Sequence, residues 1–308
     1  MTPDPDTSRP ITFSVALLAL LCCLIWSANS LAIKFTTDHI PPIGAAGIRF
    51  GIGMVPVVLW AMFARIPLRL RRIDCPIVIF HGLLLFVQIS LLNWGTSRTE
   101  AARSSVLLAA NVVFVALLAP LVVGGERLTT RRIVGFAVGS VGLLVVFGDQ
   151  IGGWRPDILA GDCAVLVSSF LLGFKITHMK RSIVALHPCH ILFWQGVISV
   201  PLFMAYSVVV EGVHAYDWRL PAVIALGYQG LGVTGFCFIC WTMLLRRHDA
   251  ASLAIFGFAS PLFGAALSIV MRADEQATMP LLVGAVLVTI GIMLATTRIR
   301  KKRLPGGG

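Results

Sequence analysis

Charged residues are scarce in this chain of 308 residues. Only 13% of the residues are Asp, Glu, Lys or Arg, against roughly 25% in soluble proteins, whereas 57% are apolar and the mean hydropathy is +0.88. This deficit excludes an ordinary soluble globular domain. The sequence therefore predicts a polytopic membrane protein.

A signal peptide and a disulfide framework are also missing. The first apolar block, from Phe13, is too long for a signal sequence and lacks a small-residue cleavage pattern, so we expect it to remain as a span. The cysteines lie in or at the ends of apolar blocks, where thiols act as small hydrophobes. Cys237 and Cys240 have redox-motif spacing but lie inside an apolar block, so packing is the preferred interpretation.

Catalytic motifs are absent as well. The chain has no His-Glu-x-x-His, no Gly-x-Ser-x-Gly, no paired aspartates and no cysteine-histidine cluster with metal-ligand spacing. We therefore expect neither an enzyme nor a bound metal or cofactor.

The apolar residues come in blocks of about 20, the length that a helix needs to cross a bilayer. Ten such blocks are predicted as transmembrane helices, at residues 13–35, 41–63, 75–95, 102–123, 132–148, 160–179, 189–210, 220–244, 250–271 and 280–297. The turn-rich loop GDQIGGWRPD at 148–157 forms the midpoint. The fold class is thus an all-α membrane protein in two halves, 13–148 and 160–297.

The distribution of basic residues predicts the orientation. Of the 25 Lys and Arg residues, 17 fall in the loops on the side of the N-terminus, six in the opposite loops and two within spans. This positive-inside bias puts both termini in the cytoplasm. The basic segment RIRKKR at 298–303 is then expected to contact anionic lipid, and nucleic-acid binding is not expected.

An internal repeat relates the two halves. At an offset of 149 residues Glu126 meets Glu275, and nine further residues meet identical partners, among them Gly135 with Gly284 and Gly142 with Gly291. An offset near 146 pairs Arg49 with Gln195. Because each half has five spans, an odd number, the second copy must enter the membrane inverted. Inverted repeats are typical of secondary transporters, and a receptor or scaffold has no comparable need for them.

These motifs resemble the EamA family of the drug/metabolite transporter superfamily over nearly the whole chain. The resemblance is carried by WSANSLAIKF at 26–35, PPIGAAGIRF at 41–50, the segment from Thr99 to Thr129, and DAASLAIFGFASPLFGAALSIVMRADE at 249–275. It implies a ten-helix carrier of the inner (cytoplasmic) membrane, commonly an exporter of amino acids or related metabolites. The runner-up is a carrier of phosphorylated or nucleotide-linked sugars.

One departure concerns the fourth span. The first half has Asn111-Val112 where the second half has Ser260-Pro261, so the kink that proline would cause is expected to be missing there.

Candidates for proton coupling are few. None of the 14 carboxylates lies in the middle of a predicted span, which argues against a carboxylate-driven antiporter. If protons are coupled, His81 or His178 is the better candidate, because imidazole titrates near neutral pH.

Two cations lie within spans. Arg49 is about eight residues inside the second span; it either attracts a substrate carboxylate or bonds to carbonyls at helix ends. Lys175 is about one turn from the cytoplasmic end of the sixth span; it either extends to the headgroups or meets an anionic group. The two are expected toward opposite membrane faces, which disfavours a phosphate site because that site needs convergent cations.

Neutral polar residues near the midplane either bond between helices or line a cavity. Trp26, Ser30 and Lys34 recur every four residues with Asn29 beside them, so we expect a polar stripe facing the cavity with Lys34 as an anchor at its rim. The predicted substrate-binding residues are Trp26, Asn29, Ser30, Arg49, Gln88, Asn111, Phe174, Lys175, Tyr228, Trp241 and Phe258. Together they suit a small zwitterion or amphiphile.

Overall fold

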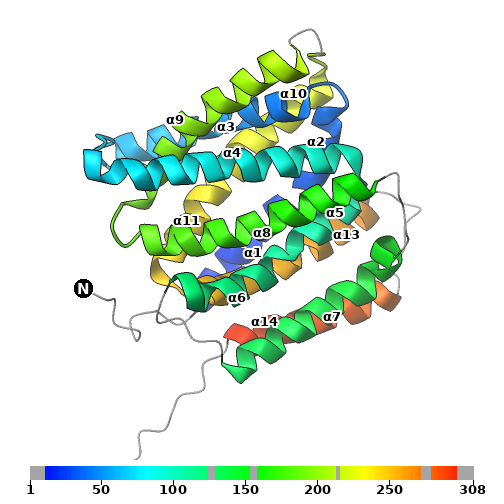
Figure 1. Cartoon of the computed structure of the whole chain (residues 1–308). Coiled ribbons are helices and arrows are strands. Elements are labelled where there is room, and N and C mark those ends of the chain that lie inside the picture. Colours follow the sequence, from blue (N-terminus) through cyan, green and yellow to red (C-terminus); the bar gives the residue numbers. More distant parts are fainter. Residues whose placement is uncertain (1–10, 124–128, 153–157, 213–215, 272–278, 297–308) are drawn as a thin grey trace, which may run out of the picture.

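Every regular element in the part of the chain that is described is a helix (Figure 1). The computed structural model describes residues 11–123, 129–152, 158–212, 216–271 and 279–296. The helices are α1 (Phe13–Ser27), α2 (Asn29–Thr37), α3 (Pro42–Phe63), η1 (Arg72–Asp74), α4 (Cys75–Arg98), α5 (Ala101–Ala109), α6 (Asn111–Val122), α7 (Thr130–Gly152), α8 (Leu159–Ser182), α9 (Pro188–Tyr206), η2 (Ser207–Glu211), α10 (Leu220–Gly227), η4 (Tyr228–Cys237), α11 (Phe238–Arg247), α12 (Ala250–Ala254), η5 (Ile255–Phe258), α13 (Ala259–Met271) and α14 (Met279–Thr296). Glu126, Glu275 and the basic segment 298–303 lie outside the described residues.

Each of the ten predicted apolar blocks contains helix. Within the described residues, seven helical stretches are long and apolar enough to cross a membrane, and shorter apolar helices cover Ala250–Gly264 and Leu282–Thr296. Large apolar side chains face outward, as Leu121 and Val209 do with exposed fractions of 80% and 82%. Polar side chains such as Gln88 and Ser168 are buried. This inside-out distribution suits a protein whose outer surface meets lipid.

Four of the apolar blocks are interrupted within their length, the eighth of them by the π-helix η4 between α10 and α11. The first breaks at Ala28, between α1 and α2, and the ninth passes from α12 through the 3-10 turn η5 to α13. The fourth breaks at Ala110, between α5 and α6, so the expectation of an unkinked helix there was wrong. The Asn111 side-chain amide donates to the Leu108 carbonyl at 2.6 Å. A short amide side chain can compete for backbone carbonyls, so asparagine interrupts this helix without proline.

Long-range contacts cap the start of α3. Pro42 occupies the first turn, where its missing N–H costs nothing, and the Glu211 carboxylate at the end of η2 accepts from the backbone N–H groups of Ile43 and Gly44, both at 2.9 Å. Ser207 also donates to this carboxylate, at 2.7 Å. A negative charge at a helix N-terminus is favourable, so this contact ties the seventh block to the second.

Helices α7 and α14 lie side by side along one edge of the molecule (Figure 1). Their glycines bring the backbones together, because a Cβ added to Gly135 would stand 2.8 Å from the Gly291 carbonyl oxygen and one added to Gly142 would stand 2.9 Å from that of Gly284. Glycine is the residue that allows such a close approach.

The remaining helices pack around the centre of the molecule, and helices that the sequence repeat aligns make similar contacts. α3 packs on η4 while α9 packs on α4, and α3 and α9 also pack on each other. α8 packs on α4, α5 and α6, and α1 packs on η4 and α13. The space between these helices is where the predicted site residues converge.

Candidate functional site

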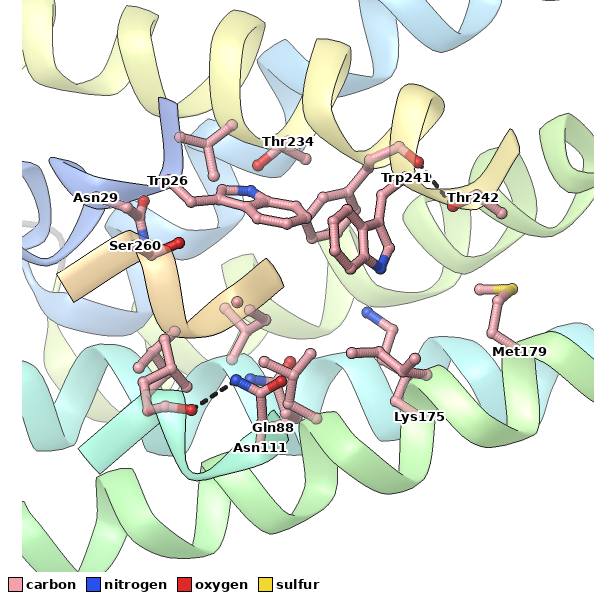
Figure 2. A pocket seen from close by; sticks show the side chains of 18 of the residues that line it. Trp26, Asn29, Gln88, Asn111, Lys175, Met179, Thr234, Trp241, Thr242 and Ser260 are labelled. Atoms are coloured by element: carbon pink, nitrogen blue, oxygen red, sulfur yellow. Dashed lines mark hydrogen bonds between the residues drawn. The ribbon is translucent and has the colours of Figure 1, made fainter. Parts of the chain in front are cut away.

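A cavity of about 180 Å³ lies at the centre of the helices. Its walls come from α1, α2, α3, α4, α5, α6, α8, α9, η4, α11, α12, η5 and α13. Figure 2 shows Trp26 and Trp241 on one side and Gln88, Asn111 and Lys175 on the other. The cavity is therefore built from elements of both halves of the chain.

Eight of the eleven predicted substrate-binding residues line this cavity. They are Trp26, Asn29, Ser30, Arg49, Gln88, Asn111, Lys175 and Trp241. The other three lie elsewhere: Phe174 packs against Phe80 and His178, the Tyr228 hydroxyl donates to the Ile25 carbonyl, and Phe258 is buried against Gly139. Some aromatic residues near the midplane thus pack between helices and others line the cavity, and the residue type alone does not distinguish them.

The polar stripe divides at the interruption between α1 and α2. Trp26, Asn29 and Ser30 line the cavity, and the Trp26 ring meets that of Trp241 edge-on, with 5.0 Å between centroids. Lys34 is not among the lining residues; its Nζ donates to the Ser97 carbonyl at 3.0 Å. Lys34 thus joins α2 to the end of α4.

Arg49 is buried, with 2% of its surface exposed. Its Nη1 donates to Asn29 Oδ1 at 3.3 Å and to Gln229 Oε1 at 3.0 Å, and its Nε has no partner among the described residues. These two partners are side-chain amides, which differ from the helix-end carbonyls of one expectation. Because both amides are neutral, they orient the guanidinium without cancelling its charge.

Lys175 is also buried, with 5% exposed, so the expectation that it extends to the headgroups was wrong. Its side chain leaves α8 toward the cavity (Figure 2), and its Nζ lies 5.2 Å from the centroid of the Phe238 ring. Within the described residues it has no hydrogen bond or ion pair. Lys175 and Arg49 line the same cavity, and their placement toward opposite membrane faces remains a prediction.

Several further polar groups on the cavity wall lack protein partners. Gln88 Oε1, Gln195 Oε1, Thr234 Oγ1 and Trp241 Nε1 are buried and unbonded within the described part of the chain. The sequence repeat pairs Gln195 with Arg49, a signal that could have placed Gln195 in the site. The repeat likewise aligns Ser260 with Asn111, whereas Thr234 and Thr242 carried no signal that the sequence analysis used.

His81, which is buried, and His178, which is partly exposed, form a pair between α4 and α8. His178 Nδ1 and His81 Nε2 are 3.2 Å apart, and the Ser182 hydroxyl lies 3.0 Å from His81 Nε2. Neither histidine lines the cavity. Their role in proton coupling remains a prediction; the contact allows a hydrogen bond between His178 Nδ1 and His81 Nε2, in which the tautomers decide the donor.

Buried ion pairs lie at the ends of the bundle. Arg103 Nε is 2.5 Å from Asp162 Oδ2, and the Thr99 hydroxyl donates to Asp162 Oδ1 at 2.6 Å. At another turn Arg132 pairs with Asp249 at 2.6 Å. These described carboxylates sit at helix ends, where they join neighbouring elements.

The sequence profile of the EamA-like transporter family matches residues 13–148 and 159–297. The chain is 26% identical to a probable amino-acid metabolite efflux pump of Escherichia coli, over 93% of this chain and 96% of the pump. It is 23% identical to the aromatic amino acid exporter YddG of Ancylobacter novellus, over 94% and 99% of the two chains. A solved crystal structure has a TM-score of 0.79 at 20% identity, covering 92% of this chain and 98% of its own, which is a likeness of fold.

Proposed function

We propose that this chain, which belongs to the EamA-like transporter family, exports amino acids or related amphipathic metabolites by alternating access. The chain is a multi-pass transporter of the inner membrane, and the names of its family and relatives point to transport rather than catalysis. The proposal includes amino acids as the cargo, ten transmembrane helices in two inverted repeats, and both termini in the cytoplasm.

The central cavity is the observation that carries the proposal. Its wall combines tryptophan rings, amide side chains and two buried cations, and it takes residues from both halves of the chain. A pocket with apolar walls and a few convergent polar groups is typical of a small-molecule site. The amino-acid exporters among the relatives favour cargo of this size and polarity.

The reciprocal packing of helices supports an inverted repeat. Gly135 faces Gly291 and Gly142 faces Gly284, whereas the sequence repeat aligns Gly135 with Gly284 and Gly142 with Gly291. A two-fold axis produces this exchange of partners. The packing of α3 on η4 and of α9 on α4 follows the same rule. Two such halves can rock against each other around a fixed site.

A flux assay tests the proposal. The purified protein would be reconstituted in sealed vesicles loaded with radiolabelled amino acids, and we expect release above that of protein-free vesicles. Asn29→Ala and Ser30→Ala should each reduce the rate or affinity, whereas Thr289→Ala, an exposed polar position on α14, should leave both unchanged. Absence of flux for every metabolite tested would contradict the proposal.

A carrier of phosphorylated or nucleotide-linked sugars is the second candidate. The observation in its favour is that Arg49 and Lys175 line one cavity, as binding of a phosphate would require. Including sugar phosphates in the flux assay separates the two candidates, because an amino-acid carrier would not release them.

A further inference from the structure

The cavity carries positive charge without a compensating negative one. Arg49 and Lys175 are its charged lining residues, and no Asp or Glu lines it in the part of the chain that the structure describes. A buried charge is costly unless it is paired, and ionisable groups at such depth in a membrane protein are usually functional. The site therefore presents two cations to whatever enters.

The neighbours of the two cations leave this charge uncompensated. Arg49 is oriented by the neutral amides of Asn29 and Gln229, and the Lys175 ammonium faces the Phe238 ring at 5.2 Å. An aromatic face attracts a cation but does not neutralise it. A ligand carboxylate could supply what these residues lack, a charge-assisted hydrogen bond.

A free amino acid brings an ammonium only one carbon away from its carboxylate. When that carboxylate approaches Lys175 or Arg49, the ammonium follows into the same positive field, and the lining offers it neutral oxygens such as Gln88 Oε1 and no carboxylate. Like charges a few ångströms apart repel strongly where the dielectric constant is low. Removing the amino group removes this repulsion and keeps the attraction.

We propose that the cavity selects amphipathic carboxylates with a net negative charge over zwitterionic amino acids and over cations. The apolar part of such a ligand would lie against Trp26, Trp241 and Phe238, and its carboxylate would approach Lys175 and Arg49. This inference rests on the proposed transport function and narrows its substrate class.

A matched set of ligands tests the selection. Leucine is a zwitterion, isocaproate is leucine without its amino group, and leucine amide is a cation with the same side chain. We expect calorimetry on the purified full-length protein to give affinities in the order isocaproate, leucine, leucine amide. The first step should be at least about tenfold, which corresponds to about 1.4 kcal/mol.

Two substitutions on α8 test the role of the charge. Lys175→Met should weaken isocaproate binding about tenfold and bring it close to that of leucine, whereas Lys175→Arg should retain the preference. Lys180→Met is the matched control, because Lys180 lies outside the cavity and donates to the carbonyls of Leu245 and His248. The control should keep the ligand order. If Lys175→Met lowers expression, Lys175→Arg and the ligand series on the unmodified protein still test the inference.

The outcomes separate this inference from the proposed function. Leucine binding as tightly as isocaproate, or no isocaproate binding at millimolar concentration, would overturn the inference while amino-acid flux could still be observed. Isocaproate binding that is unchanged in Lys175→Met would also overturn it. Failure of the transport function would instead appear as an absence of flux in the vesicle assay for every metabolite.

Discussion

His81 and His178 are the residues for which proton coupling can be tested most directly. The described carboxylates lie at helix ends, whereas these two imidazoles meet inside the bundle, 3.2 Å apart. We expect His81→Gln and His178→Gln each to abolish substrate accumulation driven by a pH gradient across vesicles. Exchange of substrate at equal pH should continue, because exchange moves no net proton.

His187→Gln is the control for these two variants, since His187 lies in the turn before α9 and caps Cys189 N there. It should leave gradient-driven accumulation intact. If both central variants still accumulate substrate on a pH gradient, the histidine pair has no part in coupling.

The buried pair of Arg103 and Asp162 provides a second prediction for single residues. Arg103→Met leaves the Asp162 carboxylate buried without its counter-charge, which should lower the free energy of unfolding by about 3 kcal/mol. Adding Asp162→Leu removes the isolated charge and should recover most of that loss. Thermal unfolding in detergent measures both. A double variant as unstable as the single one would show that the charge is not the cause.

Individual residues were predicted unevenly because a sequence gives a helix face but not how that face is rotated against its neighbours. The stripe from Trp26 to Ser30 was found through its four-residue spacing, and it lines the cavity. Phe174, Tyr228 and Phe258 are equally central in the sequence, yet they contact other helices. For Lys175, the alternative that reached the headgroups was wrong because depth was judged by distance along the chain, while burial depends on the helices packed around the residue.

At the level of elements, the close contact of α7 with α14 predicts that even a small side chain in place of a glycine there lowers the stability. Gly135→Ala puts a methyl group 2.8 Å from the Gly291 carbonyl oxygen and 2.9 Å from the Ala295 nitrogen, so these helices must separate. Such overpacking costs about 1–3 kcal/mol. We expect a lower melting temperature for the purified variant.

Gly227→Ala is the matched control for this substitution. Gly227 ends α10, and a Cβ added there meets no atom within 4 Å. Alanine is the better helix former, so this variant should be as stable as the parent or slightly more stable. Equal destabilisation of both variants would mean that the α7–α14 contact is unimportant.

The helices were predictable as elements, but their interruptions were only partly so. Apolar length alone located each helical block, because unpaired backbone groups are not tolerated in lipid. The break at Ala110 was not predicted, since only proline was considered as its cause. The Asn111 amide produces it by bonding to the Leu108 carbonyl, a local competition that hydropathy does not register.

For the whole molecule, orientation is the prediction to test. Cys75 and Cys163 would be replaced by serine, and a single cysteine would be introduced at Arg69 or at Arg219, both of which are exposed. In intact cells a membrane-impermeant maleimide should label position 219 and not position 69, because the proposed topology places the basic loops in the cytoplasm. After lysis both should react. Labelling of position 69 in intact cells would reverse the proposed topology.

At this scale the sequence predicted the fold class and the family, because both depend on features spread over the whole chain: apolar blocks, charge bias and the repeat. The cavity itself depends on how thirteen elements meet. In the sequence, Gln195 and Ser260 are related to the site only by their alignment with Arg49 and Asn111, and no alignment was used that relates Thr234 or Thr242 to it.

The reciprocal glycine contacts also bear on how such a chain evolves. If one ancestral segment was duplicated to give both halves, Gly135 and Gly142 of one copy became the surroundings of Gly291 and Gly284 of the other. A larger side chain at one of these positions would have to be matched by a smaller one at the position that it faces in the other half. On that premise the two copies would not be free to diverge independently at these positions, whereas the cavity wall accepts different residues at aligned positions, as Arg49 and Gln195 are.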